Sequence, residues 1–276
     1  TGFVRWLRSQ GTGLPRLTMT TQKATSILVC GHGSRDPAAI EEFTGVVGAL
    51  RNLLPGVDID HGFLELAAPS ISEALESMYK RGCRNITALP GMLFAAAHVK
   101  EDIPEILSDF GKDHPDVEIS LARELGLSDN LIEAASKRIN SALDQANEIA
   151  RLENDQTVLM VVGRGSRDKS ALGHQEEISA RLGEICGLKH FRTCYASVAS
   201  PQMDEALRDV VPGRFKRIVF LPWFLFTGVV VNRLQGRFRE ISDENPAIDF
   251  VEVDYFGNHP LVAQTFADRY RESISL

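Results

Sequence analysis

The sequence predicts an α/β protein of two tandem lobes, each built on a parallel sheet and related to the other by internal duplication. One observation is that short apolar runs alternate with helical stretches, as in βαβ units whose helices cover both faces of a sheet. A second observation is that the chain matches itself at a constant offset of 132 residues without relative insertions. The matched positions are Gly31 and Gly163, Pro69 and Pro201, and Pro90 and Pro222.

Within the first repeat, four apolar runs are expected to form strands, and the stretches between them are expected to form helices. The expected strands are 26–31, 57–66, 85–90 and 116–122, and the clearest helices are 37–54 and 70–82. Pro37, Pro69 and Pro201 suit the first turn of a helix, where the missing proline N–H leaves no hydrogen bond unmade. Open parallel sheets bind ligands beyond the carboxyl ends of their strands, so we expect the site at that edge.

The repeats set the expected domain boundaries. We expect an N-terminal lobe at 26–145, a C-terminal lobe at 156–276, and a joint between Gln145 and Gln156. Residues 1–25 carry four basic and no acidic side chains, and Met19 is the first methionine. We therefore expect 1–25 to be a leader that is disordered or was added to the chain, with an organellar targeting segment as the alternative.

Composition and charge restrict the function. The 276 residues suffice for one large or two small cores, and the net charge of −7 argues against nucleic acid as a main partner. No apolar run reaches the roughly 20 residues that span a membrane. The four cysteines include no Cys-x-x-Cys pair, which indicates buried thiols in a reducing compartment, by default the cytoplasm, and neither disulfides nor an iron–sulfur cluster.

Three side chains with metal-binding chemistry follow the expected strands of the first repeat. His32 follows the first strand, Glu65 the second and His98 the third, and strand ends in one sheet can converge on one cleft. Two imidazoles and a carboxylate suit a divalent first-row metal, and they equally suit a general base in a pocket. The alternatives are that the histidines are surface or capping residues and that Glu65 caps the next helix.

The remaining histidines show no partner pattern. His61, His114, His174 and His190 are expected to be structural or exposed. His259 follows the fourth strand of the second repeat, where a substrate contact and a helix cap are the two alternatives.

The second repeat has lost the metal-capable groups of the first. Arg164 stands in place of His32, Ser197 in place of Glu65, and Val230 in place of His98. One half therefore holds the chemistry, and the other contributes arginines that bind an acidic ligand or that are solvated charges on helix faces. These arginines are Arg164, Arg233 and Arg237.

Other motifs fit poorly. The segment "GHGSRD" lacks the Gly-Lys-Ser/Thr ending of a P-loop and the third glycine of a dinucleotide fingerprint. Without a Gly-x-Ser-x-Gly elbow, Ser34 is a poor nucleophile candidate. A histidine phosphatase would need an arginine just before His32 to hold phosphate, and that position is Gly31, which weakens this alternative.

The motifs "LVCGHGSRDPAAIEEF", "GFLELAAPSISEAL" and "LPGMLFAAAHVKEDIPEIL" together resemble the sirohydrochlorin chelatases of the CbiX and SirB group. These are ATP-independent class II chelatases that insert cobalt or iron into sirohydrochlorin. The resemblance runs from about Ser26 to the C-terminus and is to the long form, in which duplication and fusion replaced a homodimer of short subunits. It implies two flavodoxin-like lobes, with the tetrapyrrole in the cleft between them, in a monomer. From the net charge and the apolar runs we expect neither nucleic acid nor a membrane as a partner.

Carried over residue by residue, the resemblance implies that His32 and His98 bind the metal and that Glu65 joins them. We expect one of the three to accept the pyrrole protons, and the resemblance favours Co²⁺ in cobalamin synthesis, with Fe²⁺ in sirohaem synthesis or Ni²⁺ as alternatives. The chain lacks the histidine-rich tail and the Met-x-Cys-x-x-Cys motif of some long members, so no iron–sulfur cluster is expected. A non-catalytic metal or tetrapyrrole carrier is the alternative class of function. The residues expected to bind the substrate are Ser34, Arg35, Arg164, Arg233 and Arg237.

Overall fold

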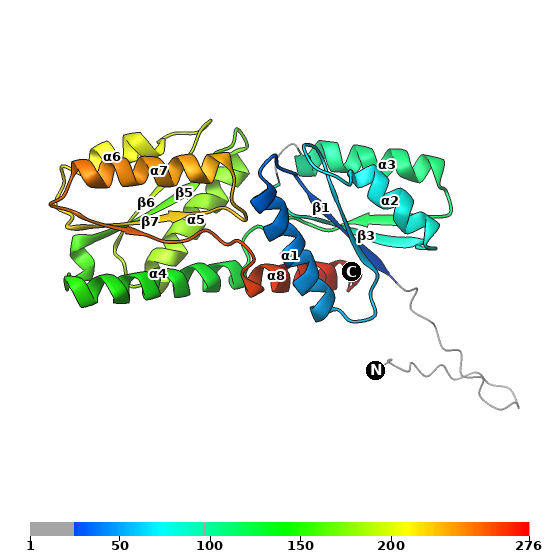
Figure 1. Cartoon of the computed structure of the whole chain (residues 1–276), viewed down its shortest axis with the longest axis horizontal. Coiled ribbons are helices and arrows are strands. Elements are labelled where there is room, and N and C mark those ends of the chain that lie inside the picture. Colours follow the sequence, from blue (N-terminus) through cyan, green and yellow to red (C-terminus); the bar gives the residue numbers. More distant parts are fainter. Residues whose placement is uncertain (1–24, 96–97, 276) are drawn as a thin grey trace, which may run out of the picture.

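Two four-stranded parallel sheets form the two lobes, as the repeat predicts (Figure 1). The computed structural model describes residues 25–95 and 98–275, without the side chain of His98, so the predicted leader lies almost entirely outside the described residues. The strand orders, β2-β1-β3-β4 and β6-β5-β7-β8, are the same in both lobes. The strands are β1 (Ser26–Gly31), β2 (Ile59–Phe63), β3 (Asn85–Pro90), β4 (Glu118–Leu121), β5 (Thr157–Gly163), β6 (His190–Tyr195), β7 (Arg217–Pro222) and β8 (Asp249–Glu252).

Helices cover both faces of each sheet, and this explains the composition of the central strands. Every residue of β1 and of β5 is buried, so these strands are apolar on both faces instead of alternating. The helices are α1 (Pro37–Leu53), α2 (Ile71–Lys80), a π-helical turn η1 (His98–Asp102) that leads into α3 (Ile103–Asp113), α4 (Asp129–Ile149), a 3₁₀ turn η2 (Asn154–Gln156), α5 (Lys169–Ile185), α6 (Met203–Val210), α7 (Val229–Glu244) and α8 (Pro260–Ile274).

Side chains at the helix starts confirm one proline prediction and correct two. Pro37 begins α1 as predicted, behind an Asp36 carboxylate that accepts a hydrogen bond from the Ala38 N–H. Pro69 and Pro201 do not enter a first turn; each precedes the N-cap residue of a capping box, which itself supplies the missing hydrogen-bond partners. His259 caps α8, its Nδ1 accepting from the Leu261 N–H at 3.2 Å, so the capping alternative is confirmed for this residue.

The last helix of each repeat packs on the sheet of the other repeat. In Figure 1, α4 lies along the second lobe, where it contacts α5 and β8, and α8 lies under the first lobe, where it contacts α1 and β3. The buried Arg217 of β7 ties the end of α4 to the second sheet by donating to Asn147 Oδ1 at 2.7 Å. The predicted ranges 26–145 and 156–276 thus follow the repeats of sequence, while each packed lobe is completed by a helix of the opposite repeat.

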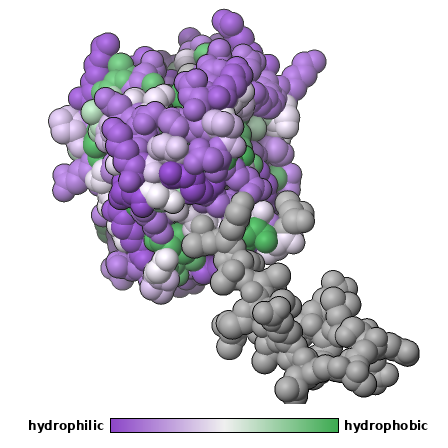
Figure 2. Space-filling model, turned by 90° about the vertical axis from the view of Figure 1, so that its right-hand side faces the viewer, coloured by the Kyte–Doolittle hydropathy of each residue, from purple (hydrophilic) through white to green (hydrophobic). Residues whose placement is uncertain are grey.

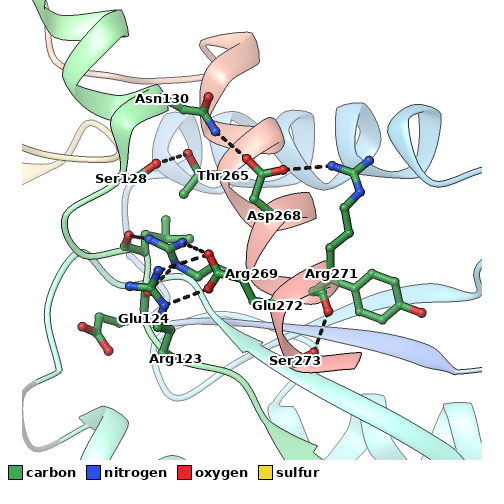
Figure 3. A network of polar contacts seen from close by, with 12 residues as sticks. Arg123, Glu124, Ser128, Asn130, Thr265, Asp268, Arg269, Arg271, Glu272 and Ser273 are labelled. Carbon is green, nitrogen blue, oxygen red and sulfur yellow. Dashed lines mark hydrogen bonds and ion pairs between the residues drawn. The ribbon is translucent and has the colours of Figure 1, made fainter. Parts of the chain in front are cut away.

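Figure 3 shows the polar contacts that fix α8 on the first lobe. The Ser128 hydroxyl contacts the Thr265 hydroxyl at 3.0 Å, and Asn130 Nδ2 donates to Asp268 at 2.8 Å. Arg269, only 4% exposed, donates from Nε to the Glu124 carbonyl at 2.9 Å. Because these partners lie at the start of α4 and in the loop before it, α4 and α8 stabilise each other where they cross between the lobes.

The described residues have the hydrophilic surface (Figure 2) and the buried thiols that the composition predicts. The end of the first lobe that Figure 2 shows is mainly hydrophilic, with scattered hydrophobic side chains. None of the described helices has the length and hydropathy of a membrane span. All four cysteines are buried and free, as predicted, and burial raises the pKa of the Cys30 and Cys194 thiols to about 12.

Candidate functional site

A close crossing of two loops sets the position of His32. Directly after β1 and β2 the chain makes two further hydrogen bonds, from Leu64 N–H to the Gly31 carbonyl at 2.9 Å and from Glu65 N–H to the His32 carbonyl at 3.1 Å. Gly33 has φ +94°, and a Cβ there would lie 1.7 Å from the Glu65 carbonyl oxygen. Only glycine fits both this backbone conformation and this approach, so the sequence "GHG" holds His32 against the second loop.

This crossing brings His32 and Glu65 together, as their strand-end positions predict. His32 Nε2 lies 3.5 Å from Glu65 Oε1, and the two side chains are 32% and 54% exposed. His32 Nδ1 lies 3.1 Å from the Gly33 carbonyl, which assigns the proton of a neutral ring to Nδ1. A histidine held in this way presents the Nε2 lone pair as a ligand, here beside a carboxylate oxygen. The Glu65 side chain does not cap α2, since Ser70 and Glu73 form that cap.

The third predicted ligand, His98, has a side chain outside the described residues. Its backbone begins η1, and two residues later Lys100 forms an ion pair with Asp168 of the second repeat. The hydrogen bond from Lys100 is the largest cause of the lowered Asp168 pKa. The start of η1 therefore lies where the two repeats meet. Among the described side chains no three His, Cys, Asp or Glu groups gather as a metal site, and the His98 imidazole is not one of those side chains.

A cavity of about 630 Å³ opens at the His32–Glu65 pair and is lined by both repeats. The first repeat contributes the loop after β1, the start of α1 and the end of β2, and the second contributes Arg164 and the segment from Phe224 to Val231. Its volume lies in the range of small-molecule sites, roughly 300–1,000 Å³. A second cavity, of about 360 Å³, continues from it into the second lobe. The residues that line both are His32, Gly91, Arg164, Phe224 and Leu225.

The structure brings three of the five predicted substrate-binding residues to the larger cavity. Ser34, Arg35 and Arg164 line it, although the Ser34 hydroxyl already accepts a hydrogen bond from the Asp36 N–H at 3.0 Å. Arg233 is exposed on α7 and lines neither of the two cavities. Arg237 also lies outside both, with its guanidinium 3.3 Å from Asp204 and 3.0 Å from Glu240.

Sequence reasoning missed Glu42, which holds a loop that lines the larger cavity. Its carboxylate accepts from the Thr227 N–H at 2.8 Å and from the Tyr255 hydroxyl at 2.7 Å, so α1 of the first repeat holds a loop of the second. Burial first, and then the Glu42 hydrogen bond, raise the pKa of Tyr255. Glu42 pairs with His174 at the repeat offset, and this unlike pair was the only signal in the sequence.

The other histidines have structural surroundings. His61 packs between Phe43 and Phe63, and burial lowers its pKa. His114 Nε2 lies 3.0 Å from Glu76, and His190 contacts Arg214 on the surface. His174 stacks on Phe94 at a centroid distance of 6.4 Å, joining α5 to the loop after β3.

Comparisons with known proteins agree with the duplicated fold. The CbiX family model matches this chain twice, over residues 26–142 and 158–273. A sirohydrochlorin cobaltochelatase of Priestia megaterium is 28% identical over 250 residues, which are 90% of this chain and 80% of the relative. A sirohydrochlorin ferrochelatase of the same organism is 27% identical over 260 residues, 94% of each chain. The solved structure of SirB from Bacillus subtilis with Fe³⁺ superposes with a TM-score of 0.77 at 27% identity, over 90% of this chain and 95% of that one.

Proposed function

Because this chain belongs to the CbiX family, we propose that it is a sirohydrochlorin chelatase, a lyase that inserts a divalent metal ion into sirohydrochlorin without ATP. The observation that carries the proposal is the His32–Glu65 pair at the wall of a cavity lined by both repeats. We propose Co²⁺ as the metal, with Fe²⁺ as the alternative that relatives of similar identity support. Since one chain supplies both walls, we also propose that it acts as a monomer.

The pair suits the first step, which is to hold the metal weakly. In the proposal, His32 Nε2 and one Glu65 oxygen bind the ion, and His98 completes the set from the start of η1. Imidazole and carboxylate ligands suit cobalt and iron. Their coordination shell is incomplete, so the nitrogens of a macrocycle can replace them one by one.

The same two groups suit the proton balance of insertion. One metal ion enters the ring, two pyrrole N–H bonds break, and two protons leave. Each ligand that releases the metal regains a lone pair beside the macrocycle, and a neutral imidazole or a carboxylate with that lone pair accepts a pyrrole proton. Both side chains keep contact with solvent, at 32% and 54% exposure, so water takes up the protons afterwards.

The cavity also suits an anionic, flat substrate. Arg35 and Arg164 bring positive charge from opposite repeats, which an otherwise acidic chain needs to bind carboxylates. Phe43, Phe63 and Phe226 provide apolar walls for the ring system.

The test follows the absorbance of sirohydrochlorin under anaerobic conditions after addition of Co²⁺ or Fe²⁺, without ATP. The wild-type chain is expected to accelerate insertion, with a higher kcat/KM for Co²⁺. His32→Ala and Glu65→Gln are expected to lower kcat by at least about a hundredfold, as loss of a group that acts on the reacting atoms does. Arg233→Ala, a change on an exposed face of α7, is the matched control. Tight tetrapyrrole binding with no acceleration for either metal would instead support a carrier.

A further inference from the structure

The smaller cavity is the repeat-related counterpart of the proposed insertion site. Each cavity has a strand-end loop of one repeat on one side and the loop after the third strand of the other repeat on the opposite side. In the larger cavity those partners are His32 and the loop from Phe224; in the smaller one they are Arg164 and the loop from Met92 to Phe94. Gly165 repeats the geometry of Gly33, with φ +89° and a Cβ position 1.8 Å from the Ser197 carbonyl oxygen.

The walls of the two cavities differ in chemistry where they correspond in position. Gln175 stands in the smaller cavity where Phe43 stands in the larger one, Tyr195 where Phe63 stands, and Trp223 where Gly91 stands. Each of these three replacements adds a hydrogen-bonding group at a position that carries none in the side chain of its counterpart in the larger cavity. In a wall that served packing alone these groups would only destabilise the fold, because each buried polar group without a partner costs about 1–3 kcal/mol of stability.

Two of the three added groups are buried without a partner. Gln175 and Trp223 are each 1% exposed, and neither the Gln175 amide atoms nor Trp223 Nε1 has a hydrogen-bond partner among the described residues. The Gln175 side chain lies over the end of β5, since a Cβ at Gly163 would come within 2.7 Å of Gln175 Oε1. The Trp223 backbone N–H donates to the Val162 carbonyl at 2.9 Å, so the residue lies beside the same strand end, and its indole packs edge-on against Phe256 at a centroid distance of 4.8 Å.

We propose that the smaller cavity is a binding site for a carboxylate carried on an apolar arm. Arg164 supplies the positive charge at the junction with the larger cavity, and the indole N–H of Trp223 and the amide NH₂ of Gln175 donate hydrogen bonds to the carboxylate oxygens. Met92, Leu93 and Leu172 form an apolar wall for the arm. The polar atoms of Gln175 and the Nε1 atom of Trp223 are closed off from solvent, so binding requires both side chains to turn toward the cavity.

Two sources can supply the same chemistry. One is an acidic arm of the macrocycle in the larger cavity, which reaches the smaller one past His32 and Arg164; this source rests on the proposed function. The other is a free organic acid of a size that fits about 360 Å³.

The indole N–H resonance of Trp223 tests the proposal directly. The chain has two tryptophans, so Trp6→Phe leaves one indole signal in a ¹H–¹⁵N spectrum, whose other peaks check the fold. The probes are 3-phenylpropionate, its neutral amide as the matched control, and metal-free sirohydrochlorin. We expect a saturable shift with a carboxylate probe and none with the amide. Arg164→Gln and Gln175→Leu should each weaken binding at least about tenfold, and Arg233→Gln should leave it unchanged.

The two sources and the proposed function separate in this experiment. A shift with sirohydrochlorin alone assigns the site to an arm of the substrate, and a shift with phenylpropionate assigns it to free acids as well. A signal that no carboxylate shifts saturably, or a shift that Arg164→Gln and Gln175→Leu leave unaltered, overturns the proposal. Metal insertion measured on the same samples reports on the chelatase function separately. Normal metal insertion together with an unshifted indole signal would contradict only the proposed carboxylate site in the smaller cavity.

Discussion

Replacing Gly33 by alanine puts a Cβ atom 1.7 Å from the carbonyl oxygen of Glu65, at a residue with φ +94°. An ordinary contact of 3.4 Å or more requires the two loops to separate by about 1.7 Å or more. That movement stretches the hydrogen bonds from Leu64 to Gly31 and from Glu65 to His32. The change therefore acts on the loop crossing that holds the His32–Glu65 pair.

The magnitude is the sum of two costs. The positive φ costs an alanine about 1–2 kcal/mol. Two weakened backbone hydrogen bonds cost about 0.5–1.5 kcal/mol each. Gly33→Ala should therefore lower the free energy of unfolding by about 2–5 kcal/mol. A displacement of His32 by about 1 Å should lower kcat for metal insertion by about a hundredfold in the molecules that remain folded.

Two other glycines provide matched controls. Gly82→Ala has the same φ of +94° with no atom near its Cβ, so it measures the conformational cost alone. Gly165→Ala meets the Ser197 carbonyl at 1.8 Å in the second repeat, so it should destabilise the protein as much as Gly33→Ala and affect kcat much less. Urea unfolding and insertion rates per folded molecule measure both quantities. Equal losses of kcat for Gly33→Ala and Gly165→Ala would refute the assignment of the chemistry to the first repeat.

Three further predictions concern contacts between or within the lobes. Lys100 holds the Asp168 pKa below its usual value of 3.8. The stability that this pair contributes is therefore present above pH 3.8 and is lost as the pH falls through the lower, folded-state pKa. In Asp168→Asn, acid unfolding should lack the loss of stability that comes from protonating Asp168. Glu42→Gln should lower the free energy of unfolding by about 1–3 kcal/mol and the pKa of Tyr255 toward its ordinary value, both measurable by denaturant and absorbance titrations. The four cysteine thiols should react with a thiol reagent only after unfolding, because all are buried; fast labelling of the native protein would contradict their placement.

Much of the fold could be predicted because glycines and prolines recur at the same positions of both repeats. The offset between Gly31 and Gly163 predicts that the two lobes share one fold, and their sheets have the same strand order. The exchange of α4 and α8 could not be predicted, since an amphipathic helix shows that it covers an apolar surface and not which of two similar sheets it covers.

The site was predictable where it depends on topology and not where it depends on packing. His32 and Glu65 follow neighbouring parallel strands, so their meeting follows from the sheet. The ion pair between Arg237 and Glu240 could be predicted from the sequence, because Glu240 follows Arg237 at the spacing of helical neighbours. The unpaired state of Gln175 and Trp223 appears only once the surrounding side chains are in place.

Anomalous diffraction from crystals of the wild-type chain soaked with Co²⁺ would show directly whether the metal binds at the His32–Glu65 pair. We predict a single strong peak in the larger cavity, about 2.0–2.3 Å from His32 Nε2 and from a Glu65 oxygen, and we expect His32→Ala to abolish it. A peak bound elsewhere in the molecule, or one that persists in His32→Ala, would contradict the assignment of metal delivery to this pair.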